Sequence, residues 1–458
     1  GGLSVAAGAS QMGASVVLLE SGKMGGDCLN YGCVPSKAMI AAGHAAELFR
    51  TSEPFGVAQQ EPVIDFAKVH KHVHDVIGAI KPNDSVERFE SLGVHVIQAA
   101  GKFIGRREVV AGDARIKAKY FVVATGSSAV VPPIPGLADV HYLTNETVFD
   151  RTECPEHLLV IGGGPIGCEL AQAHRRLGAK ATILEMFGIL AKDDPEAADV
   201  VRRQLQREGI SVREDIKVSE VSASDGGVTV EIECDDGAET ITGSHVLVAA
   251  GRRPNLDGLD LDAAGIAHSP QGIEVDARLR TTNKRVFAIG DVAGTLQFTH
   301  VAGYHAGIVI RNALFKLPAK PTYRAIPRVT YTDPELANVG LTEAEAKDRL
   351  SGDIRILRWP FAENDRAQAE RRTEGFVKVI ADRKGRIHGV CIVGPHAGEL
   401  IMPWVLAVEK GLKVGAMASV VAPYPTLSEV SKRASGSYFT ASLFSERTKK
   451  LVRFLMRF

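Results

Sequence analysis

Two cysteines separated by four residues, Cys28 and Cys33, are the side chains of this sequence best suited to do chemistry. They lie in the segment GGDCLNYGCVPSK (25–37). On a regular helix their Cα atoms would be roughly 8–9 Å apart, which exceeds the limit of about 7 Å for a disulfide. We therefore predict that one cysteine lies off the helix or that the helix is distorted, because the glycines of the segment allow unusual backbone conformations.

The residues around this cysteine pair favour reactive sulfur over inert sulfur. Pro35 suits the first turn of a helix, and a thiolate at a helix N-terminus has a lowered pKa and is reactive. Two unpaired core cysteines are the alternative, and a zinc site is a weaker one, since no second ligand pair has suitable spacing. The remaining cysteines occur singly and are interpreted as small buried apolar residues: Cys154, Cys168, Cys234 and Cys391.

The size and charge of the chain narrow the class of protein. A chain of 458 residues suits about three domains. Lys+Arg and Asp+Glu balance at 54 each, so the composition favours neither nucleic acid nor an anionic membrane as main partner. There is no apolar run of transmembrane length, and a cytoplasmic enzyme is the default expectation. The chain opens at Gly1-Gly2 directly before a helix-like stretch, so we expect it to be truncated.

Short apolar runs ending in turn residues alternate with helical patterns along most of the chain. Strand, glycine turn, helix and strand in that order form a parallel βαβ unit. From about residue 320, alternating strand-like segments and two or three helices predict an α+β domain. The predicted strands lie in 15–20, 120–126, 157–164, 181–185, 245–251 and 285–291, with RVTYT, GFVKVIA and IHGVCIVG beyond, and the helices in 2–13, 35–50, 165–178 and 195–208.

The segment GGGPIG (162–167) predicts a dinucleotide site. Gly162, Gly164 and Gly167 have GxGxxG spacing after a strand and before a helix, and Glu185 ends the next strand about 20 residues on. Free N–H groups at that helix N-terminus favour a pyrophosphate. Glu185 can bind both ribose hydroxyls and would repel a 2′-phosphate, so NADH is favoured over NADPH. The alternative is a glycine turn that merely packs tightly.

A second, partial copy of the same pattern opens the chain. Gly1-Gly2 is followed by an Ala-rich helical stretch and by a strand that ends at Glu20. Gly2 would be the third glycine of this fingerprint, and Glu20 its ribose-binding acid. Two such units predict a duplicated dinucleotide-binding function.

Here the sequence resembles the pyridine nucleotide-disulfide oxidoreductases, the family of dihydrolipoamide dehydrogenase, glutathione reductase and mercuric reductase. The resemblance covers nearly the whole chain. It implies an α/β fold class with two Rossmann-like dinucleotide-binding domains, for FAD and NAD(P), plus a C-terminal α+β dimerisation domain. The motifs that carry it, in order, are GGDCLNYGCVPSK, ATGS (124–127), GGGPIGCE (162–169), GRRPN (251–255), AIGDVAG (288–294), YTDPELANVGLTEAEA (331–346) and PTLSE (425–429). The implied boundaries are 1–148 completed by 278–318 for FAD, 149–277 for NAD(P), and 319–458 for the interface domain.

The resemblance also implies roles for the residues that match the family's motifs. Cys33 would be the thiol next to the flavin, and Cys28 the interchange thiol that attacks the substrate. Lys37 would lie beside the flavin ring, paired with Glu169, and Asp291 would bind the ribityl chain. The alternative for Lys37 is a solvated lysine on the helix surface, and the alternative for Asp291 is a simple cap or turn residue.

The other implied cofactor contacts are less specific. Residues that would contact FAD are Gly2, Glu20, Gly26, Lys37, Gly101, Thr125, Gly126, Ser127, Asp291 and Thr299, and those that would contact NAD are Gly162, Gly164, Ile166, Gly167, Glu185, Val218 and Gly251. No resident metal is expected.

One position departs from the common pattern of the family's disulfide reductases. They have a histidine directly before Pro-Thr, held by a glutamate five residues later, whereas this chain has Tyr424, with Glu429 at the expected spacing. An unperturbed phenol has a pKa of about 10, so Tyr424 is a poor general base near pH 7. Tyrosine here is similar to mercuric reductases, but the C-terminal cysteine pair that they carry has no counterpart after Cys391.

We therefore expect a flavoenzyme that moves electrons from NAD(P)H through FAD to the Cys28–Cys33 disulfide and on to a disulfide or metal acceptor. The resemblance implies a homodimer in which Tyr424 and Glu429 act in the partner's site. The alternatives are an NADH diaphorase or oxidase that uses quinone or oxygen, and a non-enzymatic redox-sensing flavoprotein. The basic, apolar tail SERTKKLVRFLMRF is interpreted as a helix packed on its own dimer, or else on a partner or membrane surface.

Overall fold

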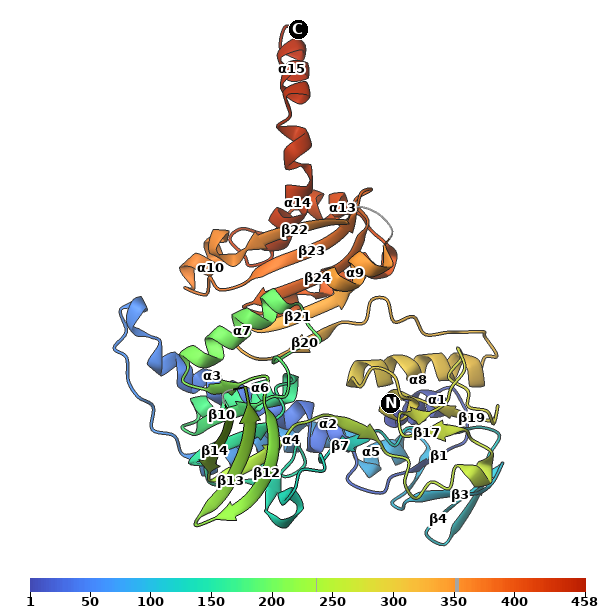
Figure 1. Cartoon of the computed structure of the whole chain (residues 1–458). Coiled ribbons are helices and arrows are strands. Elements are labelled where there is room, and N and C mark those ends of the chain that lie inside the picture. Colours follow the sequence, from blue (N-terminus) through green and yellow to red (C-terminus); the bar gives the residue numbers. More distant parts are fainter. Residues whose placement is uncertain (236, 351–353) are drawn as a thin grey trace. The chain divides into compact units, whose positions relative to one another are not determined.

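The computed structural model of the chain describes residues 1–235, 237–350 and 354–458. These residues form two compact units, and each is described by itself (Figure 1). Unit 1 comprises 1–162, 173–181 and 217–322, and unit 2 comprises 163–172, 182–216 and 323–458. Helix α6 (Pro165–Arg176) and strand β10 (Lys180–Leu184) run through the boundary between the two units.

Unit 1 contains parallel strand pairs at the places where the sequence predicts βαβ units. Their residues are apolar because both faces of a parallel sheet are covered; Leu158, Val246 and Val286 are fully buried. The parallel pairs are β1 (Val16–Leu19) with β2 (Val94–Ile97), β6 (Phe121–Val123) with β19 (Val286–Ala288), and β15 (His245–Val248) with both β9 (His157–Ile161) and β8 (Tyr142–Leu143).

Helices follow or precede these strands. Figure 1 shows α1 and α8 side by side, and their residues are in contact. Gly1, directly before α1, lies next to Ile289, which follows β19, and to Ala302 in the first turn of α8. The helices of unit 1 are α1 (Gly2–Gln11), α2 (Gly26–Asn30), α3 (Cys33–Arg50), α4 (Phe66–Ile80), α5 (Val86–Ser91) and α8 (Thr299–Ala313).

Two antiparallel meanders in unit 1 were not predicted. The first comprises β3 (Gly101–Gly105), β4 (Glu108–Ala111) and β5 (Ala114–Lys117), and the second β12 (Lys217–Ser224), β13 (Gly227–Cys234) and β14 (Gly237–Gly243). Shorter antiparallel pairs are β7 (Ser127–Ala129) with β16 (Arg252–Pro254), and β17 (His268–Ser269) with β18 (Gly272–Ile273).

Unit 2 contains a five-stranded antiparallel sheet in the order β20-β21-β24-β23-β22. Helices α12 and α14 contact this sheet, as does α7. The strands are β20 (Arg328–Thr330), β21 (Glu335–Gly340), β22 (Ile354–Pro360), β23 (Phe376–Asp382) and β24 (Ile387–Gly394), and β11 (Ser211–Arg213) pairs in parallel with β10. The helices are α7 (Pro195–Arg207), α9 (Glu343–Arg349), α10 (Asp365–Ala369), α11 (Ala397–Leu400), α12 (Met402–Lys410), α13 (Val414–Ser419), α14 (Glu429–Leu443) and α15 (Glu446–Leu455).

The expected fold class, α/β with parallel nucleotide-type strand pairs followed by an α+β region, is confirmed. Predicted strand and helix segments lie where the sequence places them, although α3 begins at Cys33 instead of residue 35. The C-terminal region has more helices than the two or three predicted, because α10, α11 and α13 are too short to give a helical pattern. In the part of the chain described, no helix has the length and apolar character needed to cross a membrane.

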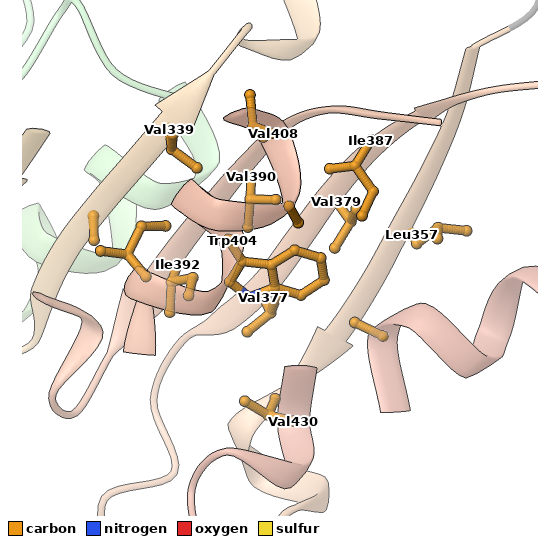
Figure 2. Close-up of a cluster of buried hydrophobic side chains, with 14 of the residues drawn as sticks. Val339, Leu357, Val377, Val379, Ile387, Val390, Ile392, Trp404, Val408 and Val430 are labelled. Carbon is orange, nitrogen blue, oxygen red and sulfur yellow. The ribbon is translucent and has the colours of Figure 1, made fainter. Parts of the chain in front are cut away.

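Trp404 is central to the core of the C-terminal sheet. Figure 2 shows its indole among valines and isoleucines of β23 and β24, with Val430 of α14 nearby. The side chain is fully buried, and its Nε1 donates a hydrogen bond to Ser431 Oγ at 3.1 Å. Because a buried indole N–H needs an acceptor, this bond ties α12 to α14 and so fixes the segment that carries Tyr424.

Replacing Trp404 by alanine should destabilise unit 2 by about 3–5 kcal/mol, because a large buried side chain leaves a cavity. The melting temperature of the holoenzyme, measured by differential scanning calorimetry, should fall. Met402→Ala on the same helix is the control, since Met402 is 66% exposed and its loss should matter little. Equal melting temperatures for the two variants would contradict this description of the core.

Candidate functional site

The two cysteines are on different helices, as the spacing required. Cys28 lies within the short helix α2, and Cys33 is the first residue of α3. The break is at Tyr31 and Gly32, where α2 ends. A Cβ at Gly32 would lie 3.0 Å from the Asp27 carboxylate and 3.1 Å from the Asp27 carbonyl oxygen, so glycine allows the tight turn. The prediction that the helix cannot run unbroken through both cysteines is confirmed.

The two sulfurs hydrogen-bond, and the bond separates their acidities. A hydrogen bond from Cys28 is the main cause that lowers the Cys33 pKa to about 6. The same hydrogen bond and burial raise the pKa of Cys28 well above its usual range. Cys33 is therefore the thiolate of the reduced pair near neutral pH, and Cys28 retains the proton.

Other groups stabilise the Cys33 thiolate as well. Its Sγ is 3.6 Å from Thr299 Oγ1, at the start of α8. Lys37, one turn along α3, also lowers the Cys33 pKa by its charge, whereas Asp27 raises it. The thiolate further lies at the N-terminus of an 18-residue helix, where the helix dipole favours negative charge.

The start of α1 packs against the ends of two strands of unit 1, β6 and β19. A Cβ at Gly1 would lie 3.2 Å from both Ile289 Cδ1 and Ala302 Cβ, and one at Gly2 would lie 3.3 Å from Ala124 Cβ. Ala124 follows β6 and Ile289 follows β19. The helix N-terminus therefore meets the carboxyl ends of two parallel strands, which is where α/β proteins bind ligands.

A chain of polar side chains links the cysteine segment to Asp291. Asp27 Oδ1 is 3.0 Å from an Arg252 guanidinium nitrogen. Arg252 donates to Ser127 Oγ at 2.8 Å and to the Ser127 carbonyl at 2.6 Å, and Ser127 Oγ donates to Asp291 Oδ2 at 2.6 Å. Asn145 Nδ2 adds a bond of 3.2 Å to Asp27 Oδ1. The roles of Asp27 and Arg252 were missed by sequence reasoning, although both lie inside its motifs.

The residues of this region fit FAD. The first turn of α1 has no side-chain cap, so its N–H groups are available to a pyrophosphate. Thr295 Oγ1, just after the segment that carries Asp291, is buried and has no hydrogen-bond partner among the residues that the structure describes. Both observations fit a ligand with polar groups in this region, and a contact of FAD with the Asp291 carboxylate stays a prediction.

Further sequence-predicted FAD residues border the same region. Thr125 Oγ1 donates to the Asn255 carbonyl at 2.8 Å, and the Gly126 carbonyl accepts from Asn255 N–H at 3.0 Å. These two hydrogen bonds join the ATGS loop to the GRRPN loop. Glu20 accepts a hydrogen bond of 2.8 Å from Gly22 N–H. A Cβ at Gly101 would lie 2.7 Å from Leu19 Cδ1, which places Gly101 next to the end of β1. Gly26 has a φ of 64° at the start of α2.

The glycine motif after β9 is divided between the two units. In unit 1, Gly162 has a φ of 113°, and a Cβ there would lie 2.5 Å from the Ala249 carbonyl oxygen, so only glycine fits. In unit 2, Glu185 accepts hydrogen bonds from Gly163 N–H at 2.5 Å and from Phe187 N–H at 3.0 Å. The acid at the strand end thus fixes the glycine turn.

For the remaining predicted NAD residues, the structure gives the position of each in the secondary structure but no contact with NAD. Gly164 precedes α6, Ile166 and Gly167 lie in its first turn, and Ile166 is 37% exposed. Val218 lies in β12, and Gly251, with a φ of 124°, precedes β16. Their contact with NAD stays a prediction.

Tyr424 and Glu429 lie in unit 2, and Tyr424 is 71% exposed. The Tyr424 hydroxyl donates to Asp365 Oδ2 at 3.1 Å, and this carboxylate raises the tyrosine pKa above its usual value. Glu429 is the first residue of α14 and adds to the same effect. Asp365 was missed by sequence reasoning, and no motif in the sequence marks it.

The predicted pairing of Lys37 with Glu169 concerns residues of different units and stays a prediction. Within unit 1, Lys37 Nζ donates to Ser36 Oγ at 3.4 Å. Within unit 2, Glu169 Oε1 accepts from Tyr331 N–H at 2.9 Å. His305 is buried, and its Nδ1 accepts a hydrogen bond from Gly290 N–H at 3.2 Å.

Comparison with known protein families agrees with this geometry. Residues 1–306 match the family described as pyridine nucleotide-disulphide oxidoreductase. Residues 326–435 match the dimerisation domain of the same family. The first match includes both cysteines, the glycine motif and Asp291, and the second includes Tyr424 and Glu429.

Individual relatives give the same assignment. The chain is 34% identical to a mercuric reductase of Bacillus cereus over 426 residues, which cover 92% of this chain and 67% of the relative. It is 36% identical to a dihydrolipoyl dehydrogenase of Geobacillus stearothermophilus over 449 residues, covering 95% and 93%. Among solved structures, the HOCl-induced flavoprotein disulfide reductase RclA from Escherichia coli superposes with a TM-score of 0.84 at 27% identity, covering 97% of each chain.

The hydrogen bond between the sulfurs can be tested with two replacements of Cys28. Serine keeps a donor for Cys33, whereas alanine removes it. In Cys28→Ser the Cys33 thiolate should therefore appear with a pH midpoint near 6, and in Cys28→Ala the midpoint should lie higher. The readout is the long-wavelength absorbance band of a thiolate next to oxidised flavin in the holoenzyme.

Cys33→Ser is the control, since it should lack that band at every pH. Identical midpoints in Cys28→Ser and Cys28→Ala would show that Cys28 does not set the acidity of Cys33.

Proposed function

The chain belongs to the pyridine nucleotide-disulphide oxidoreductase family, and from that premise we propose that it is an NADH-dependent reductase whose acceptor is a disulfide attacked by Cys28. Its activity class is that of an FAD-dependent NAD(P)H:disulfide oxidoreductase. The observation that carries the proposal is the hydrogen bond between the Cys28 and Cys33 side chains next to Thr299, which lowers the pKa of Cys33 and raises that of Cys28.

FAD, when bound, transfers two electrons between the nicotinamide and the sulfur pair. Around it we assign the backbone N–H groups of the α1 N-terminus to the pyrophosphate and the Asp291 carboxylate to the ribityl hydroxyls. Lys37 lies near the Cys33 sulfur and supplies positive charge there. The Asp27–Arg252–Ser127 contacts hold Asp291 and the cysteine segment in one arrangement.

The reduced pair can begin thiol exchange without an outside base. For the attack, the proton moves along the hydrogen bond from Cys28 to the Cys33 sulfur, against the resting order of their pKa values, and the Cys28 thiolate attacks one sulfur of the acceptor disulfide. A mixed disulfide forms, and the first acceptor thiolate leaves and takes the proton from Cys33. The Cys33 thiolate then attacks Cys28, re-forms the enzyme disulfide and releases the second thiolate, which takes a proton from the site or from water. The acceptor gains two electrons and two protons.

The raised pKa of Tyr424 favours reduction of an acceptor disulfide over oxidation of a dithiol substrate. Oxidising a dithiol substrate needs a base that removes the substrate's proton, and a phenol whose pKa is raised by Asp365 is a poor one. Reducing a disulfide instead needs a donor to the leaving thiolate, and a protonated phenol can donate. We therefore assign Tyr424 to hydrogen-bond donation in the acceptor site.

Several finer assignments complete the proposal. Glu185, a carboxylate at the end of β10, supports NADH over NADPH because it would repel a 2′-phosphate. The dimerisation domain at 326–435 supports a homodimer in which Tyr424 and Glu429 serve the partner's site. We retain the division into 1–148 with 278–318, 149–277 and 319–458. The use of free thiols fits a reducing compartment, so a cytoplasmic location is part of the proposal.

A comparison of acceptors tests the function. The holoenzyme should oxidise NADH with a small disulfide such as lipoamide or glutathione disulfide, and Cys28→Ser should abolish that activity. The same variant should retain NADH-dependent reduction of a quinone, because that reaction needs no sulfur. Hg(II) is the other acceptor to be compared, since mercuric reductases are among the relatives.

Disulfide reduction that survives in Cys28→Ser would overturn the proposal. Activity with quinone or oxygen alone would identify the chain as a diaphorase or oxidase, and activity with Hg(II) alone would reassign the acceptor.

Tyr424→Phe tests the role of the phenol. We expect a lower kcat for disulfide reduction, by about tenfold or more, because the leaving thiolate loses a hydrogen-bond donor. The shape of the pH profile of kcat/KM between pH 6 and about 9 should not change, because the raised pKa keeps Tyr424 protonated throughout that range. Loss of a titration step near neutral pH in Tyr424→Phe would instead identify Tyr424 as a general base.

A further inference from the structure

The last helix of the chain, α15, carries a large exposed apolar surface. Ser445 caps the helix by accepting from Thr448 N–H at 3.2 Å, so the segment has a defined start. None of its residues is buried. Figure 1 shows α15 (red) extending beyond α14, away from the sheet of its own unit. Its large apolar side chains are Leu451 (55% exposed), Val452 (47%), Phe454 (56%) and Leu455 (57%), followed by Met456 (81%) and Phe458 (96%).

Apolar and basic side chains lie on opposite faces of this helix. At about 100° per residue, the four large apolar side chains within α15 (Leu451, Val452, Phe454 and Leu455) occupy an arc of roughly 160°, which also contains Thr448 and, near its edge, Arg447. Lys449, Lys450 and Arg453 occupy the opposite arc, together with Glu446. Glu446 is the only acidic side chain of 446–458, against five basic ones, so the segment has a formal side-chain charge of +4, whereas the rest of the chain carries −4.

We propose that α15 is a docking helix for an anionic lipid surface, on which it lies parallel to the membrane plane. Lys and Arg on one face with Phe and Leu on the other are the pattern of interfacial helices. The basic face would meet lipid phosphates while the apolar face enters the boundary with the acyl chains. Spanning is not involved, because ten residues extend only about 15 Å, half of a hydrocarbon core.

The charge argues against a second copy of the chain as the occupant. A copy that presents the same helix brings the same charge of +4 and therefore offers no opposite charge to the basic face. The match to the family's dimerisation domain also ends at residue 435, before α15 begins. The matched dimerisation domain therefore does not include α15, and the excess of cations favours an anionic partner.

Co-sedimentation of the full-chain holoenzyme with vesicles tests the proposal. The protein should bind phosphatidylglycerol-containing vesicles at least about tenfold more tightly than vesicles of phosphatidylcholine alone, and added salt should weaken the binding. The double variant Phe454→Glu/Leu455→Glu should lose it, and so should Lys449→Glu/Arg453→Glu. Val63→Glu is the matched control, because it replaces a fully exposed apolar residue far from α15 in the sequence and should bind like the unchanged chain.

NADH-dependent quinone reduction shows that each variant is folded, and it should be unaffected by all three. Failure to bind anionic vesicles overturns the proposal, as does equal binding to neutral vesicles or binding that survives both double variants. Conversion of the holoenzyme to monomers by Phe454→Glu/Leu455→Glu in the absence of lipid would overturn it in favour of a second copy. These outcomes do not depend on which disulfide the enzyme reduces.

Discussion

The hydrogen bond between the Cys28 thiol and the Cys33 thiolate is the interaction on which the rest of the site depends. It requires two sulfurs that a continuous helix would hold too far apart, so the chain must break between them. The turn at Tyr31 and Gly32 supplies that break and leaves Cys33 at the N-terminus of α3, where its negative charge is favoured. The bond then assigns the two sulfurs different states, one that holds a proton and one that does not.

The surrounding polar network fixes that pair relative to the cofactor region. Arg252 contacts the Asp27 carboxylate and the Ser127 hydroxyl and carbonyl, and Ser127 in turn contacts Asp291. A guanidinium suits this position because its planar donors can serve several acceptors in fixed directions. The residue before Cys28 is thereby tied to the residue proposed to hold the ribityl chain. Replacement of Arg252 by lysine would keep the charge and lose that geometry.

Much of this organisation could be predicted from sequence, where a backbone constraint forces a residue type. The spacing of Cys28 and Cys33 required the helix break, and Gly162 occupies a position that only glycine fits. The meander β12–β13–β14 was not predicted although Val228, Val230 and Ile232 alternate with less buried residues, because its strands lack the glycine-terminated apolar runs that indicate buried parallel strands. The contact between Tyr424 and Asp365 could not be predicted, since it joins residues 59 apart through a fold that neither residue specifies.

The most direct measurement of the central claim is a count of thiols during anaerobic titration of the holoenzyme with NADH. One equivalent of NADH per subunit should convert the Cys28–Cys33 disulfide into two thiols, which peptide mass spectrometry detects after alkylation under denaturing conditions. The four remaining cysteines should not change their state. If NADH is consumed while Cys28 and Cys33 remain joined, electrons do not reach the sulfur pair and the account is wrong.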